Sequence, residues 1–330
     1  MARPKNLYLI VDTETATLPY IKNLDIDAKT RTKISIAKPL IYDIGWTICD
    51  RLGNIIKKEN FLVQETFFVP QIFNTAYYKE KRSVYMQMLK ENKIKADLWE
   101  NIVKVFLEDL KIVKYAIAYN GCFDMKKAIP FTDAYITALY SDNYNEWEKA
   151  QIKAIDRLAK GEKGGKNEEY LEPSFKLREN EFPMIDLWGL ACERLINANK
   201  YKDFCLENNL LTASGVYFKT SAETAYKYLM EKYDFVESHT ALDDAEIETQ
   251  ILAKALKKGK LNEPQVKPFP FRELGDTVDY VCEKKPKYIE VVKTAISTYA
   301  ETLTTESCYT ARISNLLERL TARENFLKKD

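Results

Sequence analysis

The chain has 330 residues, of which 46% are hydrophobic and 30% charged, a composition typical of a globular protein with a sizeable core. Its 50 basic and 49 acidic residues leave a formal net charge of +1, so no global field favours a nucleic-acid partner. No apolar stretch reaches the ~18–20 residues of a membrane span, and the first apolar run is too short for a signal peptide. We therefore expect a cytoplasmic protein without a membrane partner. The six cysteines have no CxxC spacing, which favours reduced core thiols over zinc ligands or disulfides.

The first predicted strand, Tyr8 to Asp12, leads directly into further polar and acidic residues. Its continuous apolar run is typical of a strand that is buried on both faces. Because alternate residues of a strand face the same side, Asp12 and Glu14 should face one site while Thr13 points away. Adjacent carboxylates repel each other, and a bound cation with oxygen ligands, Mg²⁺ or Mn²⁺, relieves that repulsion. The pattern indicates a divalent-metal site, although acids that cap turns are the alternative.

The next hundred residues alternate between strand and helix patterns. Leu18 to Lys38 is polar and is predicted to be an inserted surface loop near the site. Two β-rich runs, Pro39 to Cys49 and Ile55 to Val69, flank a hairpin turn at Asp50 to Asn54, so the first three strands should form an antiparallel meander. From Asn74 to Leu110 the apolar period is helical, which predicts two helices broken near Asn92.

The middle of the chain carries another strand and a charged excursion. Tyr115 to Tyr119 is predicted to be a buried strand, and Met125 to Leu139 a helix. Residues 146–180 are highly charged and read as an inserted, partly disordered segment that is helical at its start. Order returns at Phe182 to Trp188, which leads into a helix.

The last third of the chain is predicted to be helical. Helices are expected at Ser221 to Tyr233 and at Thr240 to Lys257, the second directly after Ser238 and His239. Prolines mark a boundary near residue 262, and Pro286 to Lys329 predicts two more helices. We therefore expect a main domain over residues 1–262, with insertions near 18–38 and 146–180, and a linker with a helical appendage over 263–330.

Acidic residues and a histidine recur where predicted strands end and helices begin. Asp124 follows the strand at Tyr115 to Tyr119, and His239 and Asp244 stand at the start of a helix. Strand ends and helix N-termini at one edge of a sheet are where α/β proteins assemble their sites. His239 is the only histidine in the chain. A lone histidine is more often structural, but its place five residues before an acid at a helix start favours a catalytic role.

Three motifs together resemble the DEDDh 3′–5′ exonucleases, a family that includes the proofreading epsilon subunit of bacterial DNA polymerase III, ribonuclease T and oligoribonuclease. The motifs are Val-Asp-Thr-Glu-Thr at Val11 to Thr15, the pair Asn120 and Asp124, and the pair His239 and Asp244. The resemblance covers roughly residues 5–260 and implies a ribonuclease H-like fold, an α/β architecture with a mixed five-stranded sheet flanked by helices. The main domain, residues 1–262, would then be the exonuclease domain.

The resemblance also implies a mechanism. Asp12 would bridge two Mg²⁺ or Mn²⁺ ions, Glu14 and Asp244 would complete one site, and Asp124 would support the other. Two ions of this kind activate a nucleophile and neutralise charge on a phosphodiester. His239, with an ordinary pKa near ~6.5, would accept the proton of the attacking water. The expected reaction releases nucleoside 5′-monophosphates from the single-stranded 3′ end of a nucleic acid, with DNA as the expected substrate.

Substrate contacts are expected from Thr13, Thr15, Asn120 and Phe123, which lie in or beside the motifs. Leu18 and Phe123 are candidates for contacting the terminal bases, with ordinary core packing as the alternative for both. The family often continues the first motif with Thr-Gly, whereas Ala16 and Thr17 follow here. The chain departs from the family here, and the difference concerns the backbone contacts that the family makes to the terminal nucleotide.

Several alternatives remain open at this stage. Asp243 adjoins Asp244, and the five-residue step from His239 favours Asp244 as the ligand. Asp186 is expected to cap or orient a helix rather than bind metal. The apolar stripes of the last two helices favour packing onto the main domain, with oligomerisation or docking of a replication or repair protein as the alternative. The rival functions are a non-catalytic nucleic-acid-binding protein on the same fold, another two-metal nuclease such as an endonuclease, and a 3′–5′ exoribonuclease.

Overall fold

A computed structural model describes residues 6–160, 184–261, 269–303 and 308–328. The chain forms two compact units, each described here by itself. The first comprises residues 1–187, 237–256 and 260–266, and the second comprises residues 188–236, 257–259 and 267–330. Residues 188–236, which the sequence analysis assigned to the main domain, thus group with the C-terminal helices. The boundary expected near residue 262 lies outside the described residues.

The first unit is built on a mixed sheet of six strands in the order β4-β3-β2-β1-β5-β6. Strand β2 is antiparallel to β1 and β3, and the remaining pairs are parallel. The bounds of the strands are β1 Tyr8–Thr17, β2 Pro39–Cys49, β3 Ile55–Val63, β4 Lys95–Asp97, β5 Tyr115–Ala118 and β6 Met184–Asp186. The α/β class and the mixed sheet are confirmed, but the expected number of five strands is wrong. The missed strand, β4, is short and polar at the edge of the sheet, where burial imposes no apolar pattern.

The first three strands form the predicted antiparallel meander. Asp50 N–H donates to the carbonyl of Asn54 at 3.1 Å, and the Asp50 side chain accepts from Leu52 N–H at 2.8 Å. Gly53 lies in the left-handed region at φ +84°, where a residue without Cβ is favoured. These contacts close the tight turn between β2 and β3 and fix their register.

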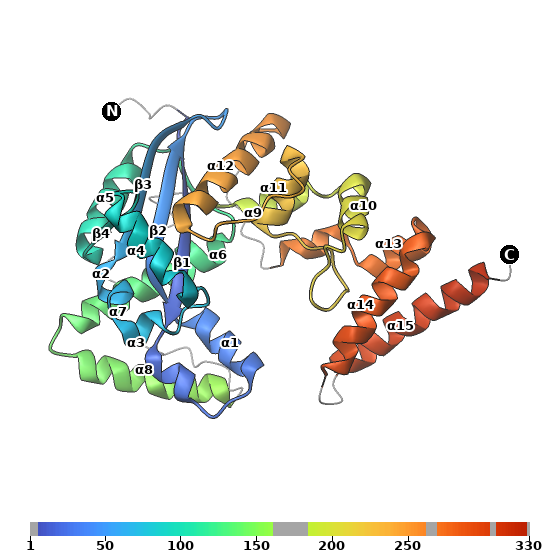
Figure 1. Ribbon diagram of the computed structural model, residues 1–330, viewed down its shortest axis with the longest axis horizontal. Helices are drawn as coiled ribbons and strands as arrows, with labels where there is room; N and C mark the ends of the chain where they lie inside the picture. The colour runs from blue at the N-terminus through green and yellow to red at the C-terminus, as the bar shows by residue number, and fades with distance from the viewer. Residues whose placement is uncertain (1–5, 161–183, 262–268, 304–307, 329–330) are drawn as a thin grey trace. The chain divides into compact units, whose positions relative to one another are not determined.

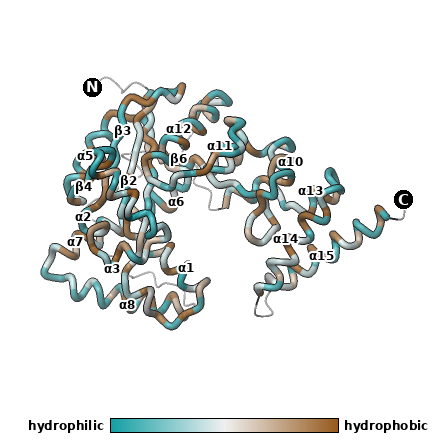
Figure 2. The backbone as a smooth tube through the Cα atoms, viewed as in Figure 1, coloured by the Kyte–Doolittle hydropathy of each residue, from teal (hydrophilic) through white to brown (hydrophobic). Residues whose placement is uncertain are grey.

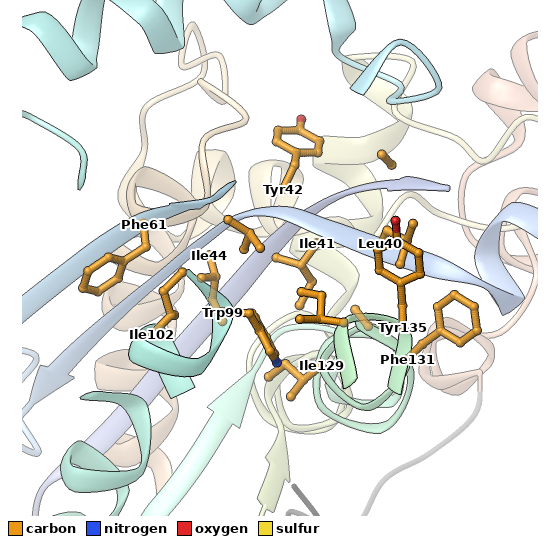
Figure 3. Packing of buried hydrophobic residues seen from close by; sticks show 14 of the residues in the cluster. Leu40, Ile41, Tyr42, Ile44, Phe61, Trp99, Ile102, Ile129, Phe131 and Tyr135 are labelled. Atoms are coloured by element: carbon orange, nitrogen blue, oxygen red, sulfur yellow. The ribbon is translucent and has the colours of Figure 1, made fainter. Parts of the chain in front are cut away.

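Helices cover both faces of the sheet (Figure 1). Trp46 of β2 points to one face, where its indole N–H donates to Asp109 of α5 (Trp99–Lys111) at 2.9 Å. Thr47, the next residue, points to the other face and lies 2.6 Å from Thr249 of α12 (Ala241–Lys258), oxygen to oxygen. In Figure 3, Ile44, Trp99 and Ile102 lie together on the first of these faces, and Ile129 of α7 (Ile129–Leu139) packs beside them. The core therefore fills the space between β2 and these helices.

The segment from Leu18 to Lys38 is not the surface loop that its polarity predicted. It forms a 3-10 turn at Pro19–Asn23 and helix α1 at Ala28–Ala37, and it buries Leu18, Ile21 and Ile34. Asp27 caps α1 by accepting a hydrogen bond from Thr30 N–H at 2.9 Å. Three widely spaced apolar residues anchor the segment, too few to give a helical period in the sequence.

The strand predicted over Ile55 to Val69 is wrong beyond Val63, because helix α2 begins at Gln64, whereas α4, α5 and α7 agree with the predicted helical regions. The break expected near Asn92 is confirmed, since Asn92 has a left-handed backbone at φ +53° between α4 and β4. The charged excursion begins with α8, and residues 161–183 lie outside the described residues. The bounds of these elements are α2 Gln64–Phe67, α3 Pro70–Phe73, a 3-10 turn Lys79–Lys81, α4 Arg82–Lys90, α6 Gly121–Phe123, a π-helical turn Asp124–Ala128 and α8 Tyr144–Ala159.

The second unit is helical, with a short bridge between Leu211 and Phe218. The two predicted C-terminal helices are α14 and α15, whose apolar stripes bury Val292, Ile296 and Ile313 within this unit. Figure 2 shows hydrophilic and hydrophobic stretches alternating along such helices. No helix in the described parts of the chain is long and apolar enough to cross a membrane. The helices assigned here are α9 Leu187–Arg194, which begins at the end of the first unit, α10 Asn199–Glu207, α11 Ala222–Met230, α13 Thr277–Glu283, α14 Ile289–Glu301 and α15 Cys308–Leu327.

Candidate metal centre

Asp12 and Glu14 lie in β1, and their side chains point to the face of the sheet that α12 covers. In the antiparallel pairing they lie opposite Gly45 and Asp43 of β2. A Cβ built on Gly45 would lie only 2.3 Å from the backbone nitrogen of Leu242, so the first turn of α12 contacts the β2 backbone directly. This close approach sets the start of α12 beside the two acids of β1.

A β-bulge shapes this edge of the sheet. The register jumps from Glu14 opposite Asp43 to Thr15 opposite Ile41, which leaves Tyr42 without a partner in β1. Figure 3 shows the Tyr42 ring on the side of β2 opposite to Ile41. As a result, Tyr42 and Asp43 lie on the same face although they are consecutive.

Asp43 is fully buried and holds the start of α12. Its carboxylate accepts hydrogen bonds from the Tyr85 hydroxyl at 2.9 Å and from Ala241 N–H at 3.0 Å. The Tyr85 hydroxyl also lies 3.4 Å from the carbonyl oxygen of His239. Asp43 and Tyr85 therefore fix the backbone between His239 and α12 against the sheet.

Helix α12 begins with a capping arrangement that separates the roles of its two adjacent acids. Asp243, the third residue of the helix, accepts hydrogen bonds from the hydroxyls of Ser238 and Thr240, both at 2.8 Å, and so ties the first turn to the residues before it. Asp244 is buried instead, and its carboxylate approaches Glu14 and His239. Ligand atoms of Glu14, His239 and Asp244 all lie within 4.8 Å of one another.

His239 is held in place from two sides. Its ring stacks on Tyr78, with ring centroids 4.4 Å apart and an angle of 15° between the planes. Its Nδ1 lies 3.6 Å from a carboxylate oxygen of Glu237. The backbone of His239 is left-handed at φ +50°, a conformation that non-glycine residues seldom adopt. The half-buried ring is thus fixed in orientation and still reachable from solvent.

Asp124 lies at the start of the π-helical turn that follows β5 and α6. It is buried, and it accepts a hydrogen bond from the Thr13 hydroxyl at 2.6 Å. Thr13 thus points away from Asp12 and Glu14, as alternation predicts, and holds a different acid of the set. Contact of Thr13 with a substrate remains a prediction.

The other predicted substrate residues have varied surroundings. Asn120 is exposed and its carbonyl accepts from Asp124 N–H at 3.1 Å, whereas Phe123 is half-buried against the core. Thr15 is half-buried, and Leu18 is 1% exposed within the core, which agrees with the packing alternative for Leu18. Contacts of Thr15, Asn120 and Phe123 with a substrate remain predictions.

Asp186 acts on the backbone, in agreement with its predicted role. It ends β6, is 2% exposed, and its carboxylate accepts a hydrogen bond from Gly121 N–H at 3.3 Å. Gly121 is the first residue of α6, so Asp186 orients the helical turn that leads to Asp124.

Burial and mutual repulsion disfavour ionisation of the clustered acids. Burial, followed by the neighbouring acids Glu237 and Asp243, raises the pKa of Asp244 to about 8. Burial also raises the pKa of Asp124 to about 7, against the lowering effect of the Thr13 hydroxyl. For Asp12 and Glu14, burial and the surrounding carboxylates raise the pKa well above its ordinary value. A cation at this place would remove that penalty.

Glu248 is a further buried acid that the sequence analysis did not consider. It lies one turn after Asp244 on α12, is 2% exposed, and accepts a hydrogen bond from Tyr119 N–H at 3.1 Å. Burial, and then the charges of Asp124 and Asp244, raise its pKa well above the ordinary value. The four-residue step from Asp244 was the available signal, because it sets both carboxylates on one helix face.

Asp43, Tyr78 and Lys81 were also missed. A single acid within the apolar run from Pro39 to Cys49 was a signal for Asp43, since buried strands rarely carry unpaired charge. Tyr78 and Lys81 lie in the stretch Asn74 to Leu110, whose apolar period indicates helices but gives no signal for a role at the site.

The residues present fit a divalent cation of the Mg²⁺ or Mn²⁺ type. Their ligand atoms are mostly carboxylate oxygens with one imidazole nitrogen, the donor set that such ions accept. One Asp244 oxygen, Oδ1, is buried and has no hydrogen-bond partner among the described residues. A buried carboxylate oxygen without a donor is costly, and a coordinated cation would satisfy it.

Comparison of the chain with models of protein families, with curated proteins and with solved structures gave no match. The three motifs come together in the fold. Asp12 and Glu14 lie in the middle of β1, which continues to Thr17 rather than ending at Asp12 as predicted, and a π-helical turn and the start of α12 bring the other residues.

Proposed function

We propose that the protein is a divalent-metal-dependent 3′–5′ exonuclease that hydrolyses single-stranded nucleic acid, with DNA as the first substrate to test. The observation that carries the proposal is the convergence of Glu14, His239 and Asp244 within 4.8 Å, with their ligand atoms facing one another. These residues belong to two of the three motifs that resemble the DEDDh exonucleases. Asp244 is buried, and Glu14 and His239 are half-buried beside it.

The architecture supports the same proposal. Without the edge strand β4, strands β3, β2, β1, β5 and β6 make a mixed five-stranded sheet with helices on both faces, which is the arrangement that a ribonuclease H-like fold implies. Asp12 and Glu14 come from the central strand β1, and α12 brings His239 and Asp244 to the same face.

Phosphodiester hydrolysis requires a nucleophilic water and stabilisation of the negative charge that grows on phosphate. Asp12, Glu14, Asp124 and Asp244 would hold the divalent cations, which when bound supply Lewis acidity to the phosphate oxygens and lower the pKa of water. The chain itself contributes the fixed positions of these carboxylates. The Thr13 hydroxyl holds the Asp124 carboxylate in position by donating a hydrogen bond to it. Glu248 accepts a hydrogen bond from Tyr119 N–H and is held beside these acids.

His239 is the residue that would take the proton from the attacking water. The Tyr78 stack and the Glu237 carboxylate fix the plane and direction of its ring, so that a nitrogen faces the site where Glu14 and Asp244 converge. General-base catalysis of this kind contributes typically ~10²–10⁴-fold to the rate. Its loss should therefore lower the rate strongly without abolishing cation binding.

The test is digestion of a 5′-labelled single-stranded DNA and a matching RNA, with Mg²⁺ or with EDTA. Wild-type protein with Mg²⁺ should give a ladder that shortens by one nucleotide at a time from the 3′ end and releases 5′-monophosphates. Asp12→Ala should leave the substrates intact. Asp142→Ala is the matched control, because Asp142 is an exposed acid in the loop before α8. This variant should cleave as wild type does.

Each other pattern of products identifies a different function. Internal fragments in place of a ladder would assign an endonuclease, and a ladder with RNA alone would assign an exoribonuclease. Intact substrates that bind the protein in a gel-shift assay would reject the enzyme and support a binding protein on the same fold. A ladder that persists in EDTA would reject the role of the metal.

A further inference from the structure

Lys81 is a cation whose charge acts on two acids of the carboxylate centre. It ends the 3-10 turn Lys79–Lys81 and is half-buried. Its positive charge lowers the pKa of Glu14 and of Asp244, against the stronger raising effect of burial on both. Its ammonium is therefore within electrostatic reach of two of the converging residues.

Direct contacts fix Lys81 beside the catalytic histidine of the proposed enzyme. Its Nζ donates to the carbonyl oxygen of Ser238, the residue before His239. The same Nζ lies 4.6 Å from the centroid of the Tyr78 ring, which is the ring that stacks on His239. Tyr78 thus contacts both Lys81 and His239.

The basic residues on either side of Lys81 have different surroundings. Lys79 is exposed at the start of the same turn. The Arg82 guanidinium packs 5.3 Å from the centroid of the Phe67 ring and donates to the Phe67 carbonyl at 3.3 Å, so it acts in the core. Of these three neighbours, Lys81 is the one directed to the acids.

We propose that Lys81 binds the phosphate of the terminal nucleotide through its ammonium, as a catalytic residue of the exonuclease proposed above. An ammonium carries three donors, and the Ser238 carbonyl takes one of them. The carboxylates alone would repel a phosphodiester, whereas a lysine at their edge attracts its non-bridging oxygens. Because it contacts both the Tyr78 ring and the loop of His239, the ammonium is fixed before substrate arrives, as transition-state stabilisation requires.

The competing interpretation is that Lys81 only neutralises the acids of the cation-free protein. The two interpretations predict different nucleotide affinities when the charge is removed. If Lys81 is a countercharge, Lys81→Met should bind Mn²⁺ more tightly and nucleotide equally well. If Lys81 binds phosphate, Lys81→Met should bind nucleotide more weakly at saturating Mn²⁺.

The experiment measures binding of thymidine 5′-monophosphate at saturating Mn²⁺, and kcat and KM for a single-stranded oligonucleotide. Lys81→Met should weaken nucleotide binding by about 10- to 100-fold, the range expected for one hydrogen bond to a charged group, and should lower kcat. Lys81→Arg should recover most of both, because it keeps the charge. Lys79→Met is the matched control and should leave both unchanged.

The outcomes separate this inference from the proposed function. If wild type binds thymidine monophosphate but leaves oligonucleotides intact, the exonuclease is rejected and the nucleotide affinities of the two Lys81 variants still decide the inference. If wild type cleaves and Lys81→Met keeps its nucleotide affinity and kcat, the inference is overturned and the exonuclease stands. Equal losses in Lys81→Arg and Lys81→Met would also overturn it, because packing rather than charge would then explain the effect. Thermal unfolding of each variant confirms that it is folded.

Discussion

The two faces of the central sheet bury carboxylates in opposite ways. On the face covered by α5, Asp109 is 4% exposed and is fully partnered: it accepts from the Trp46 indole at 2.9 Å and from the Lys57 ammonium at 2.8 and 2.7 Å. That acid has a cation and a donor of its own. Its burial therefore stabilises a defined packing of β2, β3 and α5.

On the face covered by α12, the buried acids mainly face one another. Asp43 and Asp244 each have one carboxylate oxygen, Oδ1, that is buried without a hydrogen-bond partner among the described residues. Repulsion adds to burial in raising the pKa of Glu14 and Glu248. The same sheet thus satisfies an acid on one face and leaves a group of acids unsatisfied on the other. The acids on the α12 face therefore cost stability in the cation-free protein, whereas Asp109 on the other face does not.

The largest expected effect comes from exchanging one acid on each face for its amide. Asp244→Asn should remove nearly all cleavage and raise the melting temperature of the cation-free protein, because a repelling charge is lost. Asp109→Asn should do the reverse. It should lower stability by about 1 kcal/mol, since the partner Lys57 is 37% exposed and partly screened, and should retain the activity of folded molecules. Thermal unfolding in EDTA and the cleavage assay measure both.

A loss of stability in Asp244→Asn equal to that of Asp109→Asn would contradict the comparison, because both acids would then be structural. Retained cleavage in Asp244→Asn would reject Asp244 as a cation ligand.

The next effect is on the pH dependence of stability. In the folded protein the pKa of Asp124 is about 7 and that of Asp244 about 8, whereas in the unfolded chain both titrate near 3.8. Between these values the folded state holds protons that the unfolded state has lost. Stability of the cation-free protein should therefore fall as pH rises from about 4 to about 8, by about 1.4 kcal/mol per pH unit for each proton retained.

Mg²⁺ should offset this fall, because it favours the ionised carboxylates. The increase in melting temperature on adding Mg²⁺ should be larger at pH 8 than at pH 5. An increase that is equal at both pH values would show that cation binding is not linked to these carboxylates.

A smaller effect is expected for Glu248, which lies deep in the same face. Glu248→Gln keeps an acceptor for Tyr119 N–H and removes the charge. It should weaken Mn²⁺ binding by roughly 10–100-fold, as changes beside metal ligands do, and should stabilise the cation-free protein. Glu246→Gln is the control on the same helix, because Glu246 pairs with Lys58 at 2.5 Å near the surface. Calorimetric titration with Mn²⁺ separates the two, and equal affinities would exclude an electrostatic role for Glu248.

The last expected effect concerns the packing of α12 against β2. Gly45→Ala would set a Cβ 2.3 Å from the backbone nitrogen of Leu242, so α12 must shift away from β2. Overpacking of this kind costs about 1–3 kcal/mol. Cleavage should fall with the displacement of Asp244. Gly259→Ala is the control, because the nearest neighbour of a Cβ built there is the flexible Arg194 guanidinium, at 3.4 Å. If Gly45→Ala is no less stable than wild type, the close approach does not constrain α12.

Sequence patterns predicted the parts of this fold that repeat in a regular way. The meander, the break at Asn92 and helix α12 all follow from apolar periods and turn residues. The failures have local causes: β4 is too short and polar to show a period, and Leu18 to Lys38 is anchored by widely spaced apolar residues within a polar segment.

For the site, the motif residues Glu14, His239 and Asp244 were predicted and do converge. Asp12 and Asp124 belong to the same acidic group, because, in addition to burial, the charge of Asp124 raises the pKa of Asp12. The residues that hold the site in place could not be predicted from the sequence in the same way. Tyr78 reaches His239 only through the fold, and the role of Asp43 depends on a bulge that no turn residue announces in the sequence.

The route of the chain has a consequence for synthesis. Asp12, Glu14 and Asp124 are on strands and turns that are complete before residues 188–236 are made, and those residues belong to the second unit. His239 and Asp244 are made only when the chain returns to the first unit at Glu237. The ribosome therefore releases the two halves of the centre at different times, and closing so long a loop is slow. A partly synthesised chain carries Asp12, Glu14 and Asp124 but lacks His239 and Asp244, so the proposed hydrolytic activity would report that these two parts have come together.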